Sequence, residues 1–270
     1  MMSDITLGQY FPGKSFIHKM DARIKVVLTI AVIVSLFVCK NFLSLALVFF
    51  GVVGIVVISK IPVKTIMKSL KSLSVIIIIT SLLNLFYGEG EPLFHIFSLT
   101  VTKAGVYKAI FMAFRIIALL VVGSMLTYTT TPTDLTDAIE RLLKPLTYIK
   151  IDVHSVAMTM TIALRFIPTL IEEIDKITAA QKSRGADMES GNLIHRAKAL
   201  IPILIPLFIS SFRRANELAY AMECRCYRGG KGRTKMKVVK MEARDYIALA
   251  IVVLFFAAII YLNSLMPGVI

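Results

Sequence analysis

The sequence predicts an all-α membrane protein, with about five transmembrane helices and a cytosolic platform of long amphipathic helices. Three observations predict this fold class. Of the 270 residues, 57% are hydrophobic, and the mean hydropathy is positive at +0.77. The apolar residues gather in long runs, as in membrane helices. The charged residues gather elsewhere, because residues 130–245 hold 19 of the 31 Lys and Arg and 13 of the 17 Asp and Glu.

This distribution divides the chain into three parts. Residues 1–128 are expected to form an N-terminal cytosolic segment and four membrane helices. Residues 129–245 form a cytosolic region of amphipathic helices, and residues 246–270 form the last membrane helix.

Five apolar runs account for the membrane helices: residues 26–39, 42–59, 73–87, 109–128 and 246–262. Several are shorter than the roughly 20 residues that a helix needs to cross the hydrocarbon layer. Only Lys40 and Asn41, part of the CKN segment at 39–41, separate the first two runs. These runs therefore form either two spans joined by a tight turn or a broken, partly re-entrant unit.

Basic loops predict the orientation. Lys14, Lys19, Arg23 and Lys25 precede the first run, and Lys60, Lys64, Lys68 and Lys71 follow the second. The loop after the third run instead carries Glu89 and Glu91. The positive-inside rule then places the N-terminus, the 60–71 loop and the 130–245 segment in the cytosol. Asn41, the 88–108 loop and the C-terminus lie outside in this multi-pass arrangement.

The polar segment is helical in pattern. Its first helix begins near Thr131, which starts a good N-cap region, and ends near Pro145. Two apolar stretches follow, at residues 153–171 and 199–212; both contain proline, and each runs into a charged helical segment.

Those two charged segments repeat each other weakly, and each ends in an arginine, Arg184 or Arg225. The matched apolar positions are Ile171, Ile174 and Ile177 in the first segment and Phe212, Ala215 and Leu218 in the second. At two further matched positions the charges are opposite: Glu172 and Glu173 correspond to Arg213 and Arg214. Such charges would let the two helices pair where they cross.

An arginine at a helix C-terminus interacts favourably with the helix dipole, and a following glycine can end the helix sharply. Arg184 is followed by Gly185 in this way. The guanidinium group could then bind carboxylates of a partner through paired hydrogen bonds. A plain helix cap with a solvated arginine is the alternative interpretation.

The sequence contains no catalytic or metal-binding constellation. Its four histidines are scattered, and Cys224 and Cys226 have no further Cys or His nearby to complete a zinc site. The glycine-rich RGGKGRT stretch lacks the spacing of a phosphate-binding loop. We therefore predict no catalytic residues, no metal ligands and no bound cofactor.

Several long motifs resemble the transmembrane T component of energy-coupling factor transporters, across almost the whole chain. They are GQYFPGKSFIHKMDARIK at 8–25, LTDAIERLLKPL at 135–146, IALRFIPTLIEEIDKITAAQKSRGAD at 162–187 and IPLFISSFRRANELAYAMECRCYRGGKGRT at 205–234. The resemblance implies a non-catalytic subunit of a prokaryotic cell-membrane importer for micronutrients such as vitamins or metal ions. Its partners would be two ABC-type ATPases, which bind the ATP, and a membrane S component, which binds the substrate.

The resemblance also implies which residues bind the ATPases. In the family, two cytosolic coupling helices end in Ala-Arg-Gly signatures, and each signature sits in a groove of one ATPase. The corresponding residues here are Ser183, Arg184 and Gly185 in the first helix and Cys224, Arg225 and Cys226 in the second. Cys226 replaces the glycine, so the second helix could end there or further on, at Gly229 and Gly230. The exposed faces of the segments 138–146 and 201–208 would support the S component and the membrane surface.

Two other functions stay open from the residues alone. A stand-alone secondary transporter would need an ionisable residue facing a cavity at membrane depth, and Arg115 is the main candidate. A membrane enzyme or RNA-binding protein could use the basic tail at 228–240. That tail precedes a membrane helix and fits a positive-inside anchor better, so we predict no nucleic-acid partner.

Overall fold

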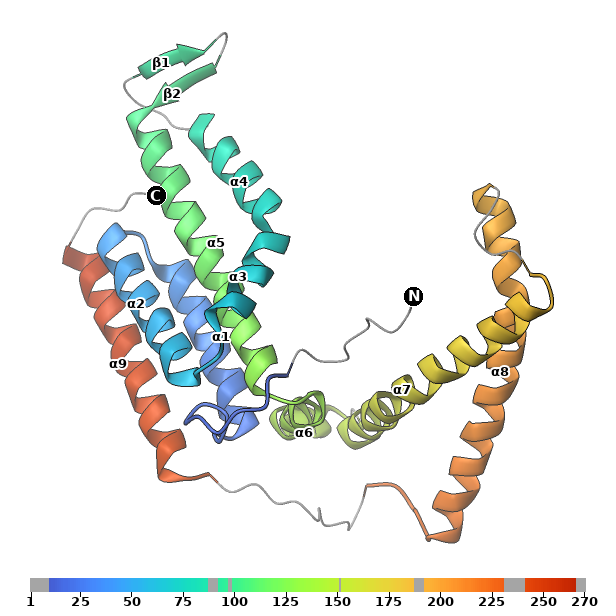
Figure 1. Ribbon diagram of the computed structural model, residues 1–270. Helices are drawn as coiled ribbons and strands as arrows, with labels where there is room; N and C mark the ends of the chain where they lie inside the picture. Colours follow the sequence, from blue (N-terminus) through green and yellow to red (C-terminus); the bar gives the residue numbers. More distant parts are fainter. Residues whose placement is uncertain are drawn as a thin grey trace. The chain divides into compact units, whose positions relative to one another are not determined.

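The computed structural model describes residues 10–86, 92–96, 99–150, 152–186, 192–230 and 241–265. Nine α-helices form most of this part of the chain (Figure 1): α1 Ala22–Val38, α2 Phe42–Ser59, α3 Val63–Ser72, α4 Ser74–Phe86, α5 Lys103–Thr129, α6 Pro132–Leu143, α7 Val153–Ser183, α8 Leu193–Cys224 and α9 Ala243–Leu265. A 3-10 helix, η1 Lys144–Ile149, follows α6, and strands β1 Pro92–Ile96 and β2 Leu99–Thr102 pair as an antiparallel hairpin. The helical membrane fold class is confirmed. Glu89, Glu91 and the tail residues 231–240 lie outside the described residues.

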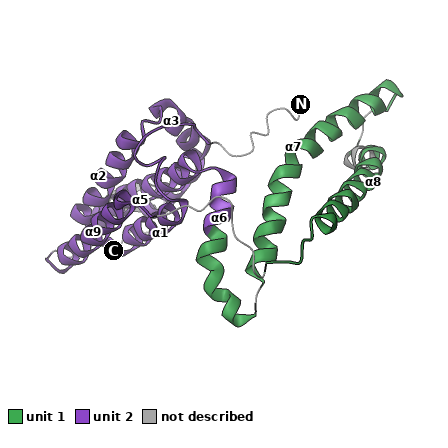
Figure 2. Cartoon of the chain, turned by 90° about the horizontal axis from the view of Figure 1, so that it is seen from below, with its two compact units in different colours: residues 1–7, 139–237 green, residues 8–138, 238–270 purple. Residues whose placement is uncertain are grey.

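The chain forms two compact units, each of which is described here by itself (Figure 2). The bundle unit comprises residues 8–138 and 238–270, and the crossed-helix unit comprises residues 1–7 and 139–237. The boundary between them falls within α6. In the bundle unit, the last helix, α9, packs against α1 and α2, which come from the first half of the chain.

Four described helices are long and apolar enough to cross a membrane: α2, α5, α7 and α9. The pair α3 and α4, bent by 59° at a short break, would make a fifth, broken span. The expected number of about five is therefore met, although the set differs. Helix α1 has only 17 residues, and α7 belongs to the segment that the charge distribution assigned to the cytosol.

Two segments expected as loops have regular structure. Most of the basic 60–71 loop belongs to α3, because Ile66 and Leu70 repeat at helical spacing and the buried Ile66 faces the core. The 88–108 loop contains the β-hairpin and the start of α5, which begins at Lys103 and not near residue 109. The side chain of Thr102 accepts a hydrogen bond from the N–H of Gly105 and so caps that helix.

The short helix α1 runs beside α9 in the same direction along its whole length. At the N-terminal ends of the two helices, the N–H of Asp21 donates to Oδ1 of Asp245 over 3.1 Å. At their other ends, Nδ2 of Asn263 donates to the carbonyl of Val38 over 2.9 Å, and Oδ1 of Asn263 accepts from the N–H of Lys40 over 3.3 Å. These contacts satisfy backbone groups that an apolar surrounding would otherwise leave unpaired. The CKN segment is therefore a turn between two antiparallel helices, and it lies at the end of α9.

Arg115 supports the same turn. Its Nη2 donates to the carbonyl of Cys39 over 2.5 Å, and its guanidinium lies 4.7 Å from the centre of the Phe111 ring. Only 8% of the Arg115 surface is exposed. The cation thus contacts a carbonyl group and an aromatic face, as expected of a structural arginine, while its Nε has no hydrogen-bond partner among the described residues.

The opposite end of the bundle unit gathers the ends of α1, α5 and α9. Nζ of Lys25 donates to the carbonyl of Thr129 over 2.8 Å and to that of His18 over 3.2 Å, so it caps the C-terminal end of α5. Asp21 forms an ion pair with Arg23 at 2.5 Å. The chain passes directly from this fixed point into α6.

Candidate partner-binding helix ends

The long helix α7 has defined ends. It begins after Asp152, whose Oδ1 accepts a hydrogen bond from the N–H of Ser155 over 3.2 Å. Two hydrogen bonds from Ser155, one from its hydroxyl and one from its N–H, lower the pKa of this exposed Asp152 carboxyl group. Asp152 is therefore a charged N-cap at neutral pH, which favours the start of the helix.

The end of α7 is closed by two hydrogen bonds around Arg184. The N–H of Gly185 donates to the carbonyl of Lys182 and the N–H of Ala186 to that of Gln181, each over 3.0 Å. Gly185 has a φ of +83°, the left-handed conformation that this C-cap requires. The helix therefore stops sharply at Arg184, as its Arg-Gly sequence predicts.

The end of α8 has the same geometry without a glycine. The N–H of Cys226 donates to the carbonyl of Glu223 over 2.8 Å, and the N–H of Tyr227 donates to that of Met222 over 3.0 Å. Cys226 takes a φ of +56°, which costs a non-glycine residue about 1–2 kcal/mol. The turn therefore stays at Cys226, where the resemblance implies a glycine, and does not move to Gly229 and Gly230.

Helices α7 and α8 pack against each other and run in roughly opposite directions. Nη2 of Arg214 on α8 donates to Oε2 of Glu173 on α7 over 2.6 Å. Further along α7, Nε2 of Gln181 donates to the carbonyl of Pro202, which lies earlier on α8. The expected pairing of opposite charges at matched positions is thus confirmed for Glu173 and Arg214.

The ion pair marks the start of two matching arms, which we define as residues 173–184, at the end of α7, and residues 214–225, at the end of α8. Arg184 lies eleven positions after Glu173, and Arg225 lies eleven positions after Arg214. Each arm therefore extends about 16 Å beyond the ion pair, at 1.5 Å per residue. Because the helices run oppositely, the two arginines lie at opposite ends of the pair and do not form one joint site.

All six residues expected to bind a partner are exposed: Ser183, Arg184, Gly185, Cys224, Arg225 and Cys226. A guanidinium group at an exposed, sharply closed helix end can reach into a groove of another protein. Such a helix end can bind a partner through its charge and its hydrogen bonds. Catalysis would need a nucleophile, a general base or a metal ion in addition. In the part of the chain that the structure describes, no group of three or more His, Cys, Asp or Glu could hold a metal ion.

The crossed-helix unit also exposes apolar side chains. On α8 these include Ile201, Leu204, Ile205, Phe208, Ile209 and Phe212, each at least 46% exposed. This surface includes the expected 201–208 face and continues to Phe212. Sequence reasoning missed Tyr148 and Ile149 of η1, which are 93% and 73% exposed. In the sequence, these two residues form an apolar pair shortly after Pro145, the residue near which the preceding helix is predicted to end.

The Glu173–Arg214 ion pair can be tested by reversing its charges. Glu173→Arg and Arg214→Glu should each lower stability by about 1 kcal/mol, since Arg214 is 36% exposed and water screens the pair. The double variant should regain most of that loss, because the attraction is restored with the charges exchanged. Thermal unfolding of the purified variants measures the coupling. Glu172→Arg, at an exposed neighbouring position, is the control and should change little.

Comparison with known proteins identifies similar chains over nearly the full length. A family model described as cobalt transport protein, CbiQ, matches residues 13–236. The energy-coupling factor transporter transmembrane protein EcfT of Clostridium kluyveri is 53% identical over 92% of this chain and 93% of its own. The EcfT protein of Ruminiclostridium cellulolyticum is 49% identical over 97% and 98%, and that of Bacillus subtilis is 39% identical over 98% and 100%.

Proposed function

Since this chain belongs to the family of energy-coupling factor transporter transmembrane proteins, we propose that its two exposed helix ends each bind one ABC-type ATPase subunit. The chain is the transmembrane component of such a transporter, and this role is not catalytic. Arg184 with Ser183 and Gly185 would occupy one ATPase. Arg225 with Cys224 and Cys226 would occupy the other.

The matching arms of α7 and α8 are the observation that carries this proposal. Both helices end in an exposed arginine held by the same C-cap hydrogen bonds, eleven residues beyond a shared ion pair. Two equal arms that point to opposite sides suit a pair of similar partners. Carboxylate groups in a partner groove would bind each guanidinium through paired, charge-assisted hydrogen bonds.

The ion pair between the arms would act as the pivot about which motion of the ATPases is transmitted. When ATP binding draws the two ATPases together, the arms would be displaced about the Glu173–Arg214 crossing. The exposed apolar surface of α8 would transmit this displacement to a membrane S component that carries a vitamin or a metal ion. The motion can reorient the S component only if their contacts differ between the two states. ATP would be bound by the partner subunits, and this chain would need no cofactor.

The orientation in the membrane is part of the same proposal. The end of the bundle unit that contains Lys25, Thr129 and Asp245 would face the cytosol, because α1 and α9 start there and α5 ends there. The N-terminus would then be cytosolic, in agreement with the lysines that precede α1. The protein would be a multi-pass component of a prokaryotic cell membrane.

Co-expression tests the proposal. The chain should co-purify with two ABC-type ATPases and an S component, and substrate uptake into cells should require all of them together with ATP. Uptake by this chain alone would instead support a secondary transporter. Retention of RNA that is lost as salt is raised would support nucleic-acid binding.

A further inference from the structure

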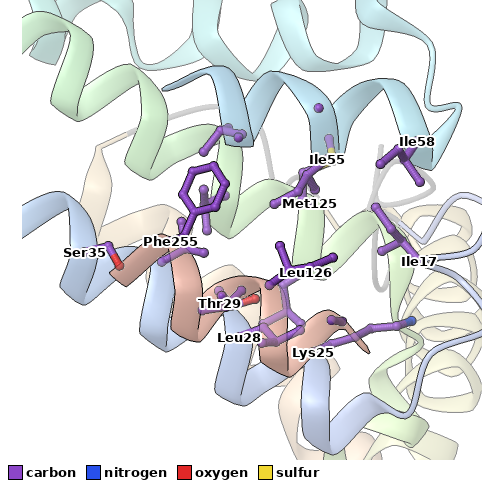
Figure 3. A pocket seen from close by; sticks show the side chains of 18 of the residues that line it. Ile17, Lys25, Leu28, Thr29, Ser35, Ile55, Ile58, Met125, Leu126 and Phe255 are labelled. Atoms are coloured by element: carbon purple, nitrogen blue, oxygen red, sulfur yellow. The ribbon is translucent and has the colours of Figure 1, made fainter. Parts of the chain in front are cut away.

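The bundle unit contains an apolar cavity of about 290 Å³ between α1, α2, α5 and α9 (Figure 3). Its walls are apolar side chains, among them Leu28, Ile55, Met125 and Phe255. The cavity reaches the outer surface of the unit, since Ile58 and Ile251 in its lining are more than half exposed. An apolar cavity of this kind excludes water and accepts apolar ligands.

Two glycines on α2 line this space. A Cβ atom added to Gly51 would lie 3.0 Å from the Phe255 ring, so α2 and α9 approach closely there. One turn further, a Cβ atom added to Gly54 would have no neighbour within 4 Å. The missing side chain at Gly54 therefore leaves an open volume inside the helix bundle.

Three polar side chains in the cavity wall, those of Ser35, Thr129 and Lys25, already have hydrogen-bond partners within the protein. The Ser35 hydroxyl donates to the carbonyl of Ala31, and the Thr129 hydroxyl donates to that of Met125, each over 2.8 Å. Nζ of Lys25 binds two backbone carbonyls. The wall therefore favours a hydrocarbon occupant over a polar one.

The rim of the cavity is basic. Ile17 lines the cavity beside Ile58, which is near the end of α2 (Figure 3), and Phe16 also belongs to the lining. The exposed lysines next to these segments are Lys14, Lys19, Lys60 and Lys64. Residues 10–20 and 57–72 include no acidic residue. An anionic group at this rim would therefore meet several positive charges from these segments, whereas Asp21, Asp134 and Asp245 lie near Lys25, another cation in the cavity wall.

The geometry points to a phospholipid-binding site: the cavity holds one acyl chain of an anionic phospholipid, and the headgroup lies at the lysine-bearing rim. A membrane helix bundle is surrounded by such chains, and the opening lets one enter from the side. The bound chain fills the volume that Gly54 leaves and contacts all four helices. The lipid thereby bridges α2 to α1 and α9 and stabilises the packing of these helices in the bundle unit.

A photoactivatable lipid tests this site in the full-length chain, purified with its co-expressed transporter partners. Vesicles containing diazirine-labelled phosphatidylglycerol should label peptides of this chain that line the cavity. Gly54→Leu should lower this labelling roughly tenfold, because a leucine side chain displaces about two methylene groups of the lipid. Ala248→Leu fills the space from the α9 wall and should act alike.

The matched control is Gly123→Leu. Gly123 is also a helical glycine with no neighbour within 4 Å of an added Cβ atom, but it is exposed on α5 and outside the cavity. Its labelling should equal that of the wild type. Diazirine-labelled phosphatidylcholine should label the wild type several-fold less, and Lys19→Gln with Lys60→Asn should remove this preference.

Three results would overturn the inference. Unchanged labelling in both Gly54→Leu and Ala248→Leu would show that lipid does not enter the cavity. An equal loss in Gly123→Leu would show that added bulk, and not cavity filling, matters. Equal wild-type labelling by both lipids would show that the rim does not select an anionic headgroup.

Discussion

Reversing Arg184 and Arg225 together to glutamate should abolish ATP-dependent uptake and prevent stable association with the ATPases. Each exposed helix end would then present a carboxylate to a groove suited to a guanidinium group. Truncating one partner of a buried, hydrogen-bonded charge pair costs roughly 2–5 kcal/mol, and reversal adds repulsion. Each single reversal should therefore weaken association at least about thirtyfold, and the double reversal should weaken it far more.

Pull-down of the ATPases from detergent-solubilised membranes, together with substrate uptake, measures this effect. The control is the double reversal of Arg165 and Lys150, which are exposed on α7 and at the end of η1, far in sequence from Arg184 and Arg225, and give the same change in net charge. Arg184→Lys with Arg225→Lys keeps the charge but loses paired hydrogen bonding, so it should bind with intermediate strength. Normal ATPase recovery by the glutamate double variant would rule out the proposed contact.

Replacing Asp245 by alanine should destabilise the bundle unit by about 3 kcal/mol. Only 3% of Asp245 is exposed, and its two oxygens accept hydrogen bonds from the N–H groups of Asp21 and Glu242. Hydrogen bonds to a charged group contribute about 1.5–3 kcal/mol each, and alanine removes both acceptors. The same change also removes the contact that holds the first ends of α1 and α9 together.

Thermal unfolding in detergent should show the effect of Asp245→Ala as a Tm lowered by roughly 6–12 °C. Asp245→Asn keeps one oxygen acceptor for the N–H of Asp21, so it should recover about half of the loss. Asp175→Ala, at an exposed position on α7, is the control and should stay within about 0.5 kcal/mol of the wild type. A wild-type Tm for Asp245→Ala would mean that this contact does not hold α9 in place.

Much of the helical architecture could be predicted from local pattern. The run at 42–59 coincides with α2, and the last run lies within α9, because long apolar segments have few alternatives to helix. The opposite charges at Glu173 and Arg214 were recognised from their matched positions along two similar helices. The amphipathic spacing of α3 also indicates a helix, although its lysines are equally typical of a basic loop.

The end of α8 shows the limit of reasoning from residue type. Glycine is the usual residue in a left-handed C-cap, and its replacement at Cys226 left two possible helix ends. The structure keeps the turn at Cys226, where the N–H groups of Cys226 and Tyr227 donate to the carbonyls of Glu223 and Met222. Backbone hydrogen bonding outweighs the modest conformational cost of a cysteine.

The sequence by itself determined the class of the protein, its apolar helices, the family resemblance and the two arginine endings. All of these depend on composition or on residues close together in the chain. Only the tertiary structure decided that Asp245 holds Asp21, that Arg115 binds the turn at Cys39, and that Gly54 opens a cavity. Those contacts join residues that are far apart in sequence. They follow from which helix faces which, and that choice depends on the packing of all four helices together.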